Sequence, residues 1–175
     1  MNPKNRCAIC KQQSARILRE VADEHGLVSI ADGTNADDIT GYRPGYETGR
    51  AAGITHPPFV EAGITKDDIR AIARMHSIPE YAKPSASCLA TRIPYDECLD
   101  PQLLVRIARA EEVIFAAGAQ QVRVRVHGDV ARIETDPESS EEIFARRDAI
   151  SRALHTLGFR HVTLDLDGFT SGSMD

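Results

Sequence analysis

The sequence has 175 residues, of which 42% are hydrophobic and 27% are charged. This length allows one domain of ordinary size or two small ones, and the content of Val, Ile and Leu excludes a disordered chain. The net charge of −5 argues against electrostatic binding to nucleic acid. No apolar run approaches the roughly 20 residues that cross a bilayer, and the first residues lack the hydrophobic stretch of a signal peptide. We therefore expect a cytoplasmic protein with neither nucleic-acid nor membrane partners.

Periodic and polar patterns alternate at the start of the chain. Helical spacing of apolar residues predicts a helix over residues 12–25, and a short strand is expected over residues 27–31. A polar loop follows, in which Thr34 and Asp37 have the spacing of a capping box. This order predicts a strand, a polar loop and the start of a helix.

Glycine and proline dominate the next part of the sequence. They predict a long loop over residues 41–58 and a second one over residues 82–94. Between these loops, Thr65 and Asp68 form a second capping box, which predicts a helix that ends before Pro79.

A regular pattern of helices and strands begins near residue 101. We expect a helix over residues 101–118, and then two strands that pair through a turn at Gly128 and Asp129. A capping box of Ser139 and Glu142 predicts a helix that ends at Gly158, and alternation predicts a last strand over residues 162–167. This order of elements is typical of a compact α+β unit.

The predicted hairpin places basic side chains on one face. Its turn pairs Arg125 with Arg132 and Arg123 with Glu134, while the valines face the core. Guanidinium groups arranged in this way match the oxygens of a phosphate group. The alternative is a solvated strand face in which the arginines pair with Glu134.

Four cysteines are further candidates for chemistry: Cys7, Cys10, Cys88 and Cys98. In a reducing compartment they are more often thiols, metal ligands or nucleophiles than disulfides. Cys7 and Cys10 form a C-x-x-C pair, which suits half of a metal site, a redox pair or two ordinary cysteines. Cys88 lies in a loop with Arg92, whose positive charge favours the nucleophilic thiolate; the alternative is a small buried hydrophobic residue.

Acidic side chains are candidates for binding a divalent cation, and their alternative role is that of ordinary surface charges. These candidates are Glu111, Glu112, Glu134, Glu141 and Glu142.

Several short segments together resemble one family, and they run in that family's order over nearly the whole chain. They are NRCAICK (5–11), ADGTNADD (31–38), YRPG (42–45), EAGITK (61–66), KP (83–84) with CLATRIPY (88–95), VRVRVH (122–127), and VTLDLDGF (162–169) with SGSM (171–174). The set is similar to the LarE family, which comprises ATP-dependent sacrificial sulfur transferases of the PP-loop ATP-pyrophosphatase superfamily.

This resemblance implies a function in making the nickel-pincer nucleotide of lactate racemase. Family members use ATP and magnesium to adenylate a carboxylate of a pyridinium dicarboxylate mononucleotide, which is a small-molecule nucleotide substrate. A cysteine then forms a thioester and gives up its sulfur, leaving dehydroalanine. Cys88 occupies the donor position.

The resemblance also implies binding residues. The residues expected to bind the substrate phosphate are Arg92, Arg123 and Arg125. Those expected to bind the nucleotide are Asp32, Gly33, Thr34, Asn35 and Asp38. Those expected to bind the metal are Glu111, Glu134 and Glu142.

The implied fold is α/β, with two domains. Residues 1–82 would form a partial PP-loop domain of the Rossmann type, and residues 83–175 would form a smaller α+β domain that carries Cys88. The chain contains no Gly-Gly, so the family's phosphate-binding Ser-Gly-Gly-x-Asp-Ser loop is absent, and we expect the chain to start past it. A sheet without its first strand exposes an edge, which predicts a homo-oligomer or a separate partner chain that carries the loop.

Cys98 departs from the family pattern and opens an alternative. Some relatives hold a [4Fe-4S] cluster with three cysteines and transfer exogenous sulfide. Here Cys88 and Cys98, with Cys7 or Cys10, are the candidate ligands. Two further alternatives remain: the chain is a non-catalytic binding module, or it is half of a split enzyme.

Overall fold

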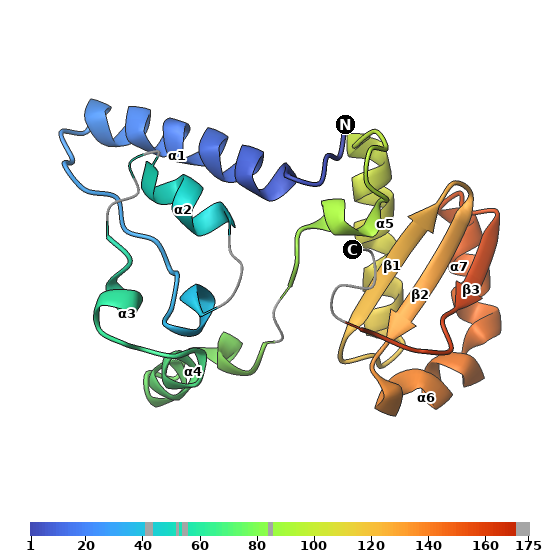
Figure 1. Ribbon diagram of the computed structural model, residues 1–175. Helices are drawn as coiled ribbons and strands as arrows, with labels where there is room; N and C mark the ends of the chain where they lie inside the picture. The colour runs from blue at the N-terminus through green and yellow to red at the C-terminus, as the bar shows by residue number, and fades with distance from the viewer. Residues whose placement is uncertain (41–43, 52, 54–55, 84–85, 171–175) are drawn as a thin grey trace. The chain divides into compact units, whose positions relative to one another are not determined.

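A computed structural model describes residues 1–40, 44–51, 53, 56–83 and 86–170 (Figure 1). Its contacts divide the chain into two compact units. Unit 1 comprises Met1–Pro3 and Pro84–Asp175, and unit 2 comprises Lys4–Lys83. Unit 2 is therefore an insertion in the chain of unit 1. No helix in the described ranges is long and apolar enough to cross a membrane.

Unit 2 is helical over its described residues. Its elements are α1 (Arg6–Glu24), η1 (Asp37–Ile39), α2 (Pro44–Ala51), α3 (Pro58–Glu61), α4 (Lys66–Met75) and η2 (Pro79–Ala82). The predicted first helix is confirmed, but it begins earlier, so that Cys7 and Cys10 lie on its first turns. Helix α2 packs against α1.

The strand predicted over residues 27–31 is wrong. The described part of unit 2 has a single parallel bridge between Ala31 and His56 in its place. The His56 N–H donates to the Ile30 carbonyl at 3.2 Å, and the Asp32 N–H donates to the His56 carbonyl at 3.2 Å. One bridge orders the backbone immediately before the polar loop without forming a ladder.

The long loop predicted over residues 41–58 is wrong where α2 and the start of α3 lie. Pro44 is the first residue of α2, a position that suits proline because its fixed φ is already helical and it needs no N–H partner there. Residues 41–43, 52, 54 and 55 lie outside the described part.

Of the two capping boxes predicted in unit 2, one is confirmed. The Asp68 N–H donates to Thr65 Oγ1 at 3.2 Å, and the Thr65 N–H donates to Asp68 Oδ2 at 2.9 Å. The box of Thr34 and Asp37 is wrong, because Asn35 Oδ1 accepts the N–H groups that open η1. An asparagine side chain competes well for this position because it bonds the backbone two residues ahead.

Unit 1 is a mixed sheet with helices packed against one face (Figure 1). Its elements are η3 (Leu89–Arg92), α5 (Pro101–Ala116), β1 (Val122–His127), β2 (Val130–Thr135), η4 (Pro137–Ser139), α6 (Ser140–Ala145), α7 (Arg147–Thr156) and β3 (His161–Leu164). Strands β1 and β2 are antiparallel, and β2 and β3 are parallel. The predicted order of elements and the hairpin register, with Arg125 opposite Arg132 and Arg123 opposite Glu134, are confirmed.

The helical region after the hairpin begins earlier than predicted and is interrupted. Asp136 is its cap and accepts the Ser139 N–H at 3.1 Å, because Pro137 already starts the first turn. The predicted box of Ser139 and Glu142 is therefore wrong, and a break at Arg146 separates α6 from α7. Burial alone would raise the pKa of Asp136, but its hydrogen bonds from Ser139 and Gln121 hold that pKa below its ordinary value.

The core of unit 1 lies between the sheet and its helices. The valines of β1 alternate into it and meet apolar side chains from α5 and α7. The members with no exposed surface are Ile107, Ala110, Ile114, Val122, Val124, Ala131 and Leu154. This core fixes the position of β1, on whose other face the arginines lie.

Shortening one core side chain tests this packing. Ile107→Ala removes a side chain with no exposed surface, and we expect it to lower the free energy of unfolding by about 2–5 kcal/mol. Val105→Ala on the same helix is the control: Val105 is 53% exposed, so its change should stay within about 0.5 kcal/mol. Urea denaturation measures both, and equal losses would contradict the assignment of the core.

Candidate functional site

Cys88 lies at the start of η3 with its side chain exposed. Its carbonyl oxygen accepts three hydrogen bonds: from Thr91 N–H at 2.9 Å, from Thr91 Oγ1 at 2.7 Å and from Arg92 Nη1 at 3.3 Å. The loop predicted over residues 82–94 thus contains a short helix. The backbone of Cys88 is fixed while its thiol remains accessible.

Arg92 and Glu111 form a buried ion pair beside Cys88. Arg92 Nε donates to Glu111 Oε1 at 2.7 Å, and Nη2 donates to Oε2 at 3.1 Å, which is the bidentate arrangement. The remaining nitrogen, Nη1, donates to Ser87 Oγ at 2.7 Å and to Thr91 Oγ1 at 2.8 Å. Arg92, a predicted phosphate ligand, is thus only 2% exposed and uses all its nitrogens within the protein.

Arg125 connects the sheet to the same segment. Its Nη1 donates to the Thr91 carbonyl at 2.7 Å, and its Nε donates to Glu134 Oε2 at 3.0 Å. Glu134 has no exposed surface and also accepts Arg132 Nη2 at 2.9 Å. The pairing of hairpin arginines with Glu134 is confirmed. The expectation that this face is solvated is wrong at Arg123, Arg125 and Glu134, which are buried.

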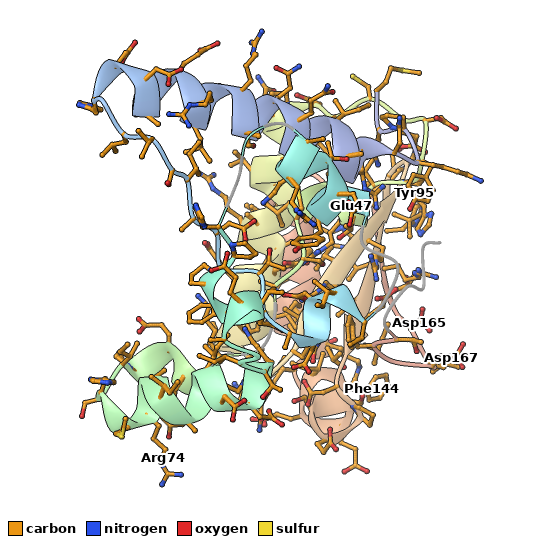
Figure 2. The ribbon with its side chains drawn as sticks, turned by 60° about the vertical axis from the view of Figure 1, so that its left-hand side comes forward. Glu47, Arg74, Tyr95, Phe144, Asp165 and Asp167 are labelled. Carbon is orange, nitrogen blue, oxygen red and sulfur yellow. The ribbon has the colours of Figure 1, made fainter. Side chains whose placement is uncertain are left out.

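Arg123 lies on the same face of β1 and is 6% exposed. Its Nη1 donates to the Val122 carbonyl at 2.7 Å, and its guanidinium carbon is 5.1 Å from the centre of the Phe169 ring. The Phe169 N–H in turn donates to the Thr135 carbonyl at 2.9 Å. The segment after β3 therefore folds back over this arginine, and Figure 2 shows Asp165 and Asp167 close together on that segment.

These buried charges form one group, which we call the arginine–glutamate cluster: Arg92, Glu111, Arg123, Arg125 and Glu134. Burial lowers the pKa of Arg123 below its ordinary value, and the positive charges of Arg92 and Arg125 lower it further. Glu111 and Glu134 act in the opposite direction. Among its own members the cluster has more cations than anions, and it therefore favours an anion at its edge.

The carboxylates predicted to bind a metal do not form a ligand set as they stand. Glu111 and Glu134 are engaged by guanidinium groups, and exposed Glu142 of α6 pairs with Arg146, the residue that follows this helix. No group of three or more His, Cys, Asp or Glu residues in the described ranges has the geometry to hold a metal ion. A metal at these residues stays a prediction.

The four cysteines are likewise distributed over both units. Cys7 and Cys10 lie on α1 of unit 2, whereas Cys88 and Cys98 belong to unit 1, and all four are free and exposed. None of them belongs to a metal-holding group within the part of the chain that the structure describes. The iron–sulfur hypothesis therefore also stays a prediction.

The predicted nucleotide-binding residues lie on one ordered loop of unit 2. Asp32 forms a 2.8 Å ion pair with Lys11 of α1 and accepts the Thr34 N–H at 3.1 Å. Gly33 lies between Asp32 and Thr34, and Asn35, which is 5% exposed, accepts the Asp38 N–H at 3.2 Å. The structure brings all five predicted residues into one short stretch.

Sequence reasoning missed several residues that shape the site. Thr91 holds the Cys88 carbonyl, and its place three residues after the cysteine is a usable signal. No sequence signal indicates Phe169 or Asn2, because the residues that they contact lie far away in the sequence.

Removing the charge of Glu111 tests the buried pair. Glu111→Gln keeps the shape but leaves Arg92 buried without a counter-charge, so we expect a loss of about 3–5 kcal/mol in the free energy of unfolding. Glu112→Gln is the matched control, because Glu112 is exposed and adjacent. Denaturant titration measures the free energy of unfolding of both variants. Equal stability of Glu111→Gln and Glu112→Gln would show that the buried pair does not organise the site.

The Asp32 carboxyl should titrate below its ordinary pKa of 3.8. Burial alone would raise this pKa, but the hydrogen bonds and charge of Lys11, with the hydrogen bonds from Thr34, outweigh it. Asp32 therefore stabilises the fold above pH 3.8, and this contribution is lost as the pH falls through the lower folded-state value.

Carbon-detected NMR of the carboxyl group measures this titration. Lys11→Met should raise the pKa of Asp32, whereas Lys4→Met, at an exposed position, should leave it unchanged. An unchanged Asp32 titration in Lys11→Met would contradict the role given to this ion pair.

Similar proteins were found in three organisms. The uncharacterized protein slr1717 of Synechocystis sp. is 36% identical over 177 residues, covering 99% of this chain and 65% of that protein. The pyridinium-3,5-bisthiocarboxylic acid mononucleotide synthase of Lactiplantibacillus plantarum is 34% identical over 158 residues, covering 90% and 57%. The uncharacterized protein MJ0830 of Methanocaldococcus jannaschii is 30% identical over 172 residues, covering 97% and 66%.

The chain spans 57% to 66% of the length of these relatives. No family model matches the sequence.

Proposed function

We propose, from the support that these identities give to a place in the LarE family, that this chain takes part in ATP-dependent sulfur transfer with Cys88 as the donor. The relative from L. plantarum is named for a bisthiocarboxylic acid mononucleotide product. The corresponding substrate is a pyridinium dicarboxylate mononucleotide, and the reaction belongs to nickel-pincer nucleotide synthesis.

The proposed chemistry is redox-neutral at every step. A substrate carboxylate attacks the α-phosphorus of ATP and releases pyrophosphate, which gives an acyl adenylate. The Cys88 thiolate attacks the acyl carbon and releases AMP, which gives a thioester. A base then removes the α-proton of Cys88, the electron pair forms the Cα–Cβ double bond, and the Cβ–S bond breaks. The thiocarboxylate leaves, and dehydroalanine remains in the chain.

One observation carries this proposal: an exposed thiol on a fixed backbone stands beside a buried cluster with excess positive charge. The fixed backbone limits the positions that the thiol samples, which favours attack on a bound acyl group. The excess of arginines favours the phosphate of the substrate, which we assign to Arg92, Arg123 and Arg125. Because every nitrogen of Arg92 already donates within the protein, direct contact of a phosphate with Arg92 requires one of these hydrogen bonds to be exchanged. Because Phe169 covers Arg123, direct contact of a phosphate with that guanidinium requires Phe169 to move.

For unit 2 we propose a partial PP-loop domain that binds ATP together with its magnesium. The parallel bridge between Ala31 and His56 precedes the Asp32 loop, and nucleotides bind beyond the carboxyl ends of parallel strands. We assign the nucleotide contacts to Asp32, Gly33, Thr34, Asn35 and Asp38. A homo-oligomer is the proposed assembly.

Intact mass spectrometry tests the donor directly. Protein purified without oxygen and incubated with ATP, magnesium and the dicarboxylate nucleotide should lose about 34 Da, the mass of hydrogen sulfide, at Cys88. Cys88→Ser should abolish the loss, and Cys98→Ser should retain it.

Two outcomes would overturn this proposal. An unchanged mass at Cys88 would show that the cysteine is not consumed. A broad absorbance at about 400 nm that disappears in Cys98→Ser would favour transfer through an iron–sulfur cluster instead.

A further inference from the structure

The amino-terminal end of the chain contacts the segment that carries Cys88. Asn2 belongs to unit 1 and has no exposed surface. Its Nδ2 lies 3.2 Å from the Ala90 carbonyl, 2.8 Å from the Ile93 carbonyl and 3.0 Å from the Pro94 carbonyl. Its own backbone carbonyl accepts the Asp96 N–H at 3.0 Å. A single amide group therefore satisfies backbone acceptors on both sides of the end of η3.

The chemistry of this contact requires an amide. The Ile93 and Pro94 carbonyls lie where the chain leaves η3, and carbonyls shielded from water without a partner are costly, so a donor is favoured here. The amide nitrogen of asparagine has two hydrogens, which three carbonyls share. An aspartate in this place would offer no donor when ionised and would put a negative charge against three carbonyl oxygens.

Asn2 completes a set of contacts that fixes the whole Cys88 segment. Thr91 and Arg92 hold the Cys88 carbonyl, Arg125 holds the Thr91 carbonyl, and Asn2 holds the carbonyls of Ala90, Ile93 and Pro94. The first group of contacts comes from η3 and the sheet. The second group of contacts comes from Asn2, near the amino terminus, and neither the hairpin nor α5 supplies these contacts.

We infer that Asn2 is a positioning residue for Cys88: by fixing the carbonyls that follow the cysteine, it holds the thiol in the orientation from which it attacks. The meaning of this role for catalysis rests on the proposed function. The role itself is a local one, because the core between α5, α7 and the sheet does not include Asn2. Loss of the amide should loosen residues 88–94 and leave the hairpin intact.

The experiment compares Asn2→Asp with Asn5→Asp, which makes the same chemical change at an exposed position without a side-chain cap hydrogen bond. Asn2→Ala, which removes the donors without adding a charge, serves if Asn2→Asp does not fold. Amide hydrogen exchange is followed by NMR at Thr91 and Ile93, whose N–H groups bond the Cys88 and Ala90 carbonyls. In the Asn2 variants both amides should exchange at least about tenfold faster, with the amides of β1 and β2 unchanged.

A second readout separates positioning from general stability. Alkylation by iodoacetamide, quantified peptide by peptide, should change at Cys88 by about threefold or more and stay constant at Cys98, which is also exposed in unit 1. In single-turnover sulfur transfer, the rate constant should fall about tenfold, and the substrate concentration at half-maximal rate should stay within about twofold. Asn5→Asp should match the unmodified chain in every measurement.

Each contrary result has a distinct meaning. Unchanged exchange at Thr91 and Ile93 would overturn the inference, and so would loss of protection throughout β1 and β2, since Asn2 would then support the whole unit. Faster local exchange with an unchanged transfer rate would overturn the catalytic part. Absence of transfer in the unmodified chain would overturn the proposed function, while exchange and alkylation would still decide whether Asn2 orders the Cys88 segment.

Discussion

The buried pair of Arg92 and Glu111 is the interaction on which the site depends. It joins three elements, because Glu111 extends from α5, Arg92 from η3, and Glu111 Oε1 also accepts the Val124 N–H of β1 at 3.0 Å. Burying two charges is costly, and bidentate geometry with further hydrogen bonds is what compensates for their lost hydration. The same carboxylate therefore satisfies the open edge of the sheet and fixes the segment that carries Cys88.

The arginines of β1 follow from this arrangement. A hairpin with valines on one face and arginines on the other normally has a dry side and a wet side. Here η3 and the segment after β3 cover the second side too, so Arg123 and Arg125 are buried with Glu134 as their neighbour. Fixed cations in a place shielded from water interact more strongly with an approaching anion than solvated ones do. The cluster therefore places fixed positive charges next to the segment that carries the thiol.

Local patterns predicted unit 1 well because its elements are consecutive in sequence. The alternation of Val122, Val124 and Val126 and the turn at Gly128 fixed the hairpin register, since a shift by one residue would put valines in water. The helical parts of residues 41–58 were missed because glycine and proline conceal a helix whose packing on α1 comes from tertiary contact. The spacing of Cys88 and Arg92 predicted that these residues lie close together, but no local signal shows that Arg92 is buried. No sequence pattern indicated the role of Asn2, because its hydrogen-bond partners lie 88, 91 and 92 residues away along the chain.

The residues between Asn2 and its hydrogen-bond partners include all of unit 2. The contact between Asn2 and the Cys88 segment closes a chain loop that contains all of unit 2. The entropy lost on closing a loop grows with the length of flexible chain inside it, and a folded insert replaces that flexible length with two ends at a fixed spacing. Folding of unit 2 therefore sets the effective concentration of Asn2 at its carbonyl partners.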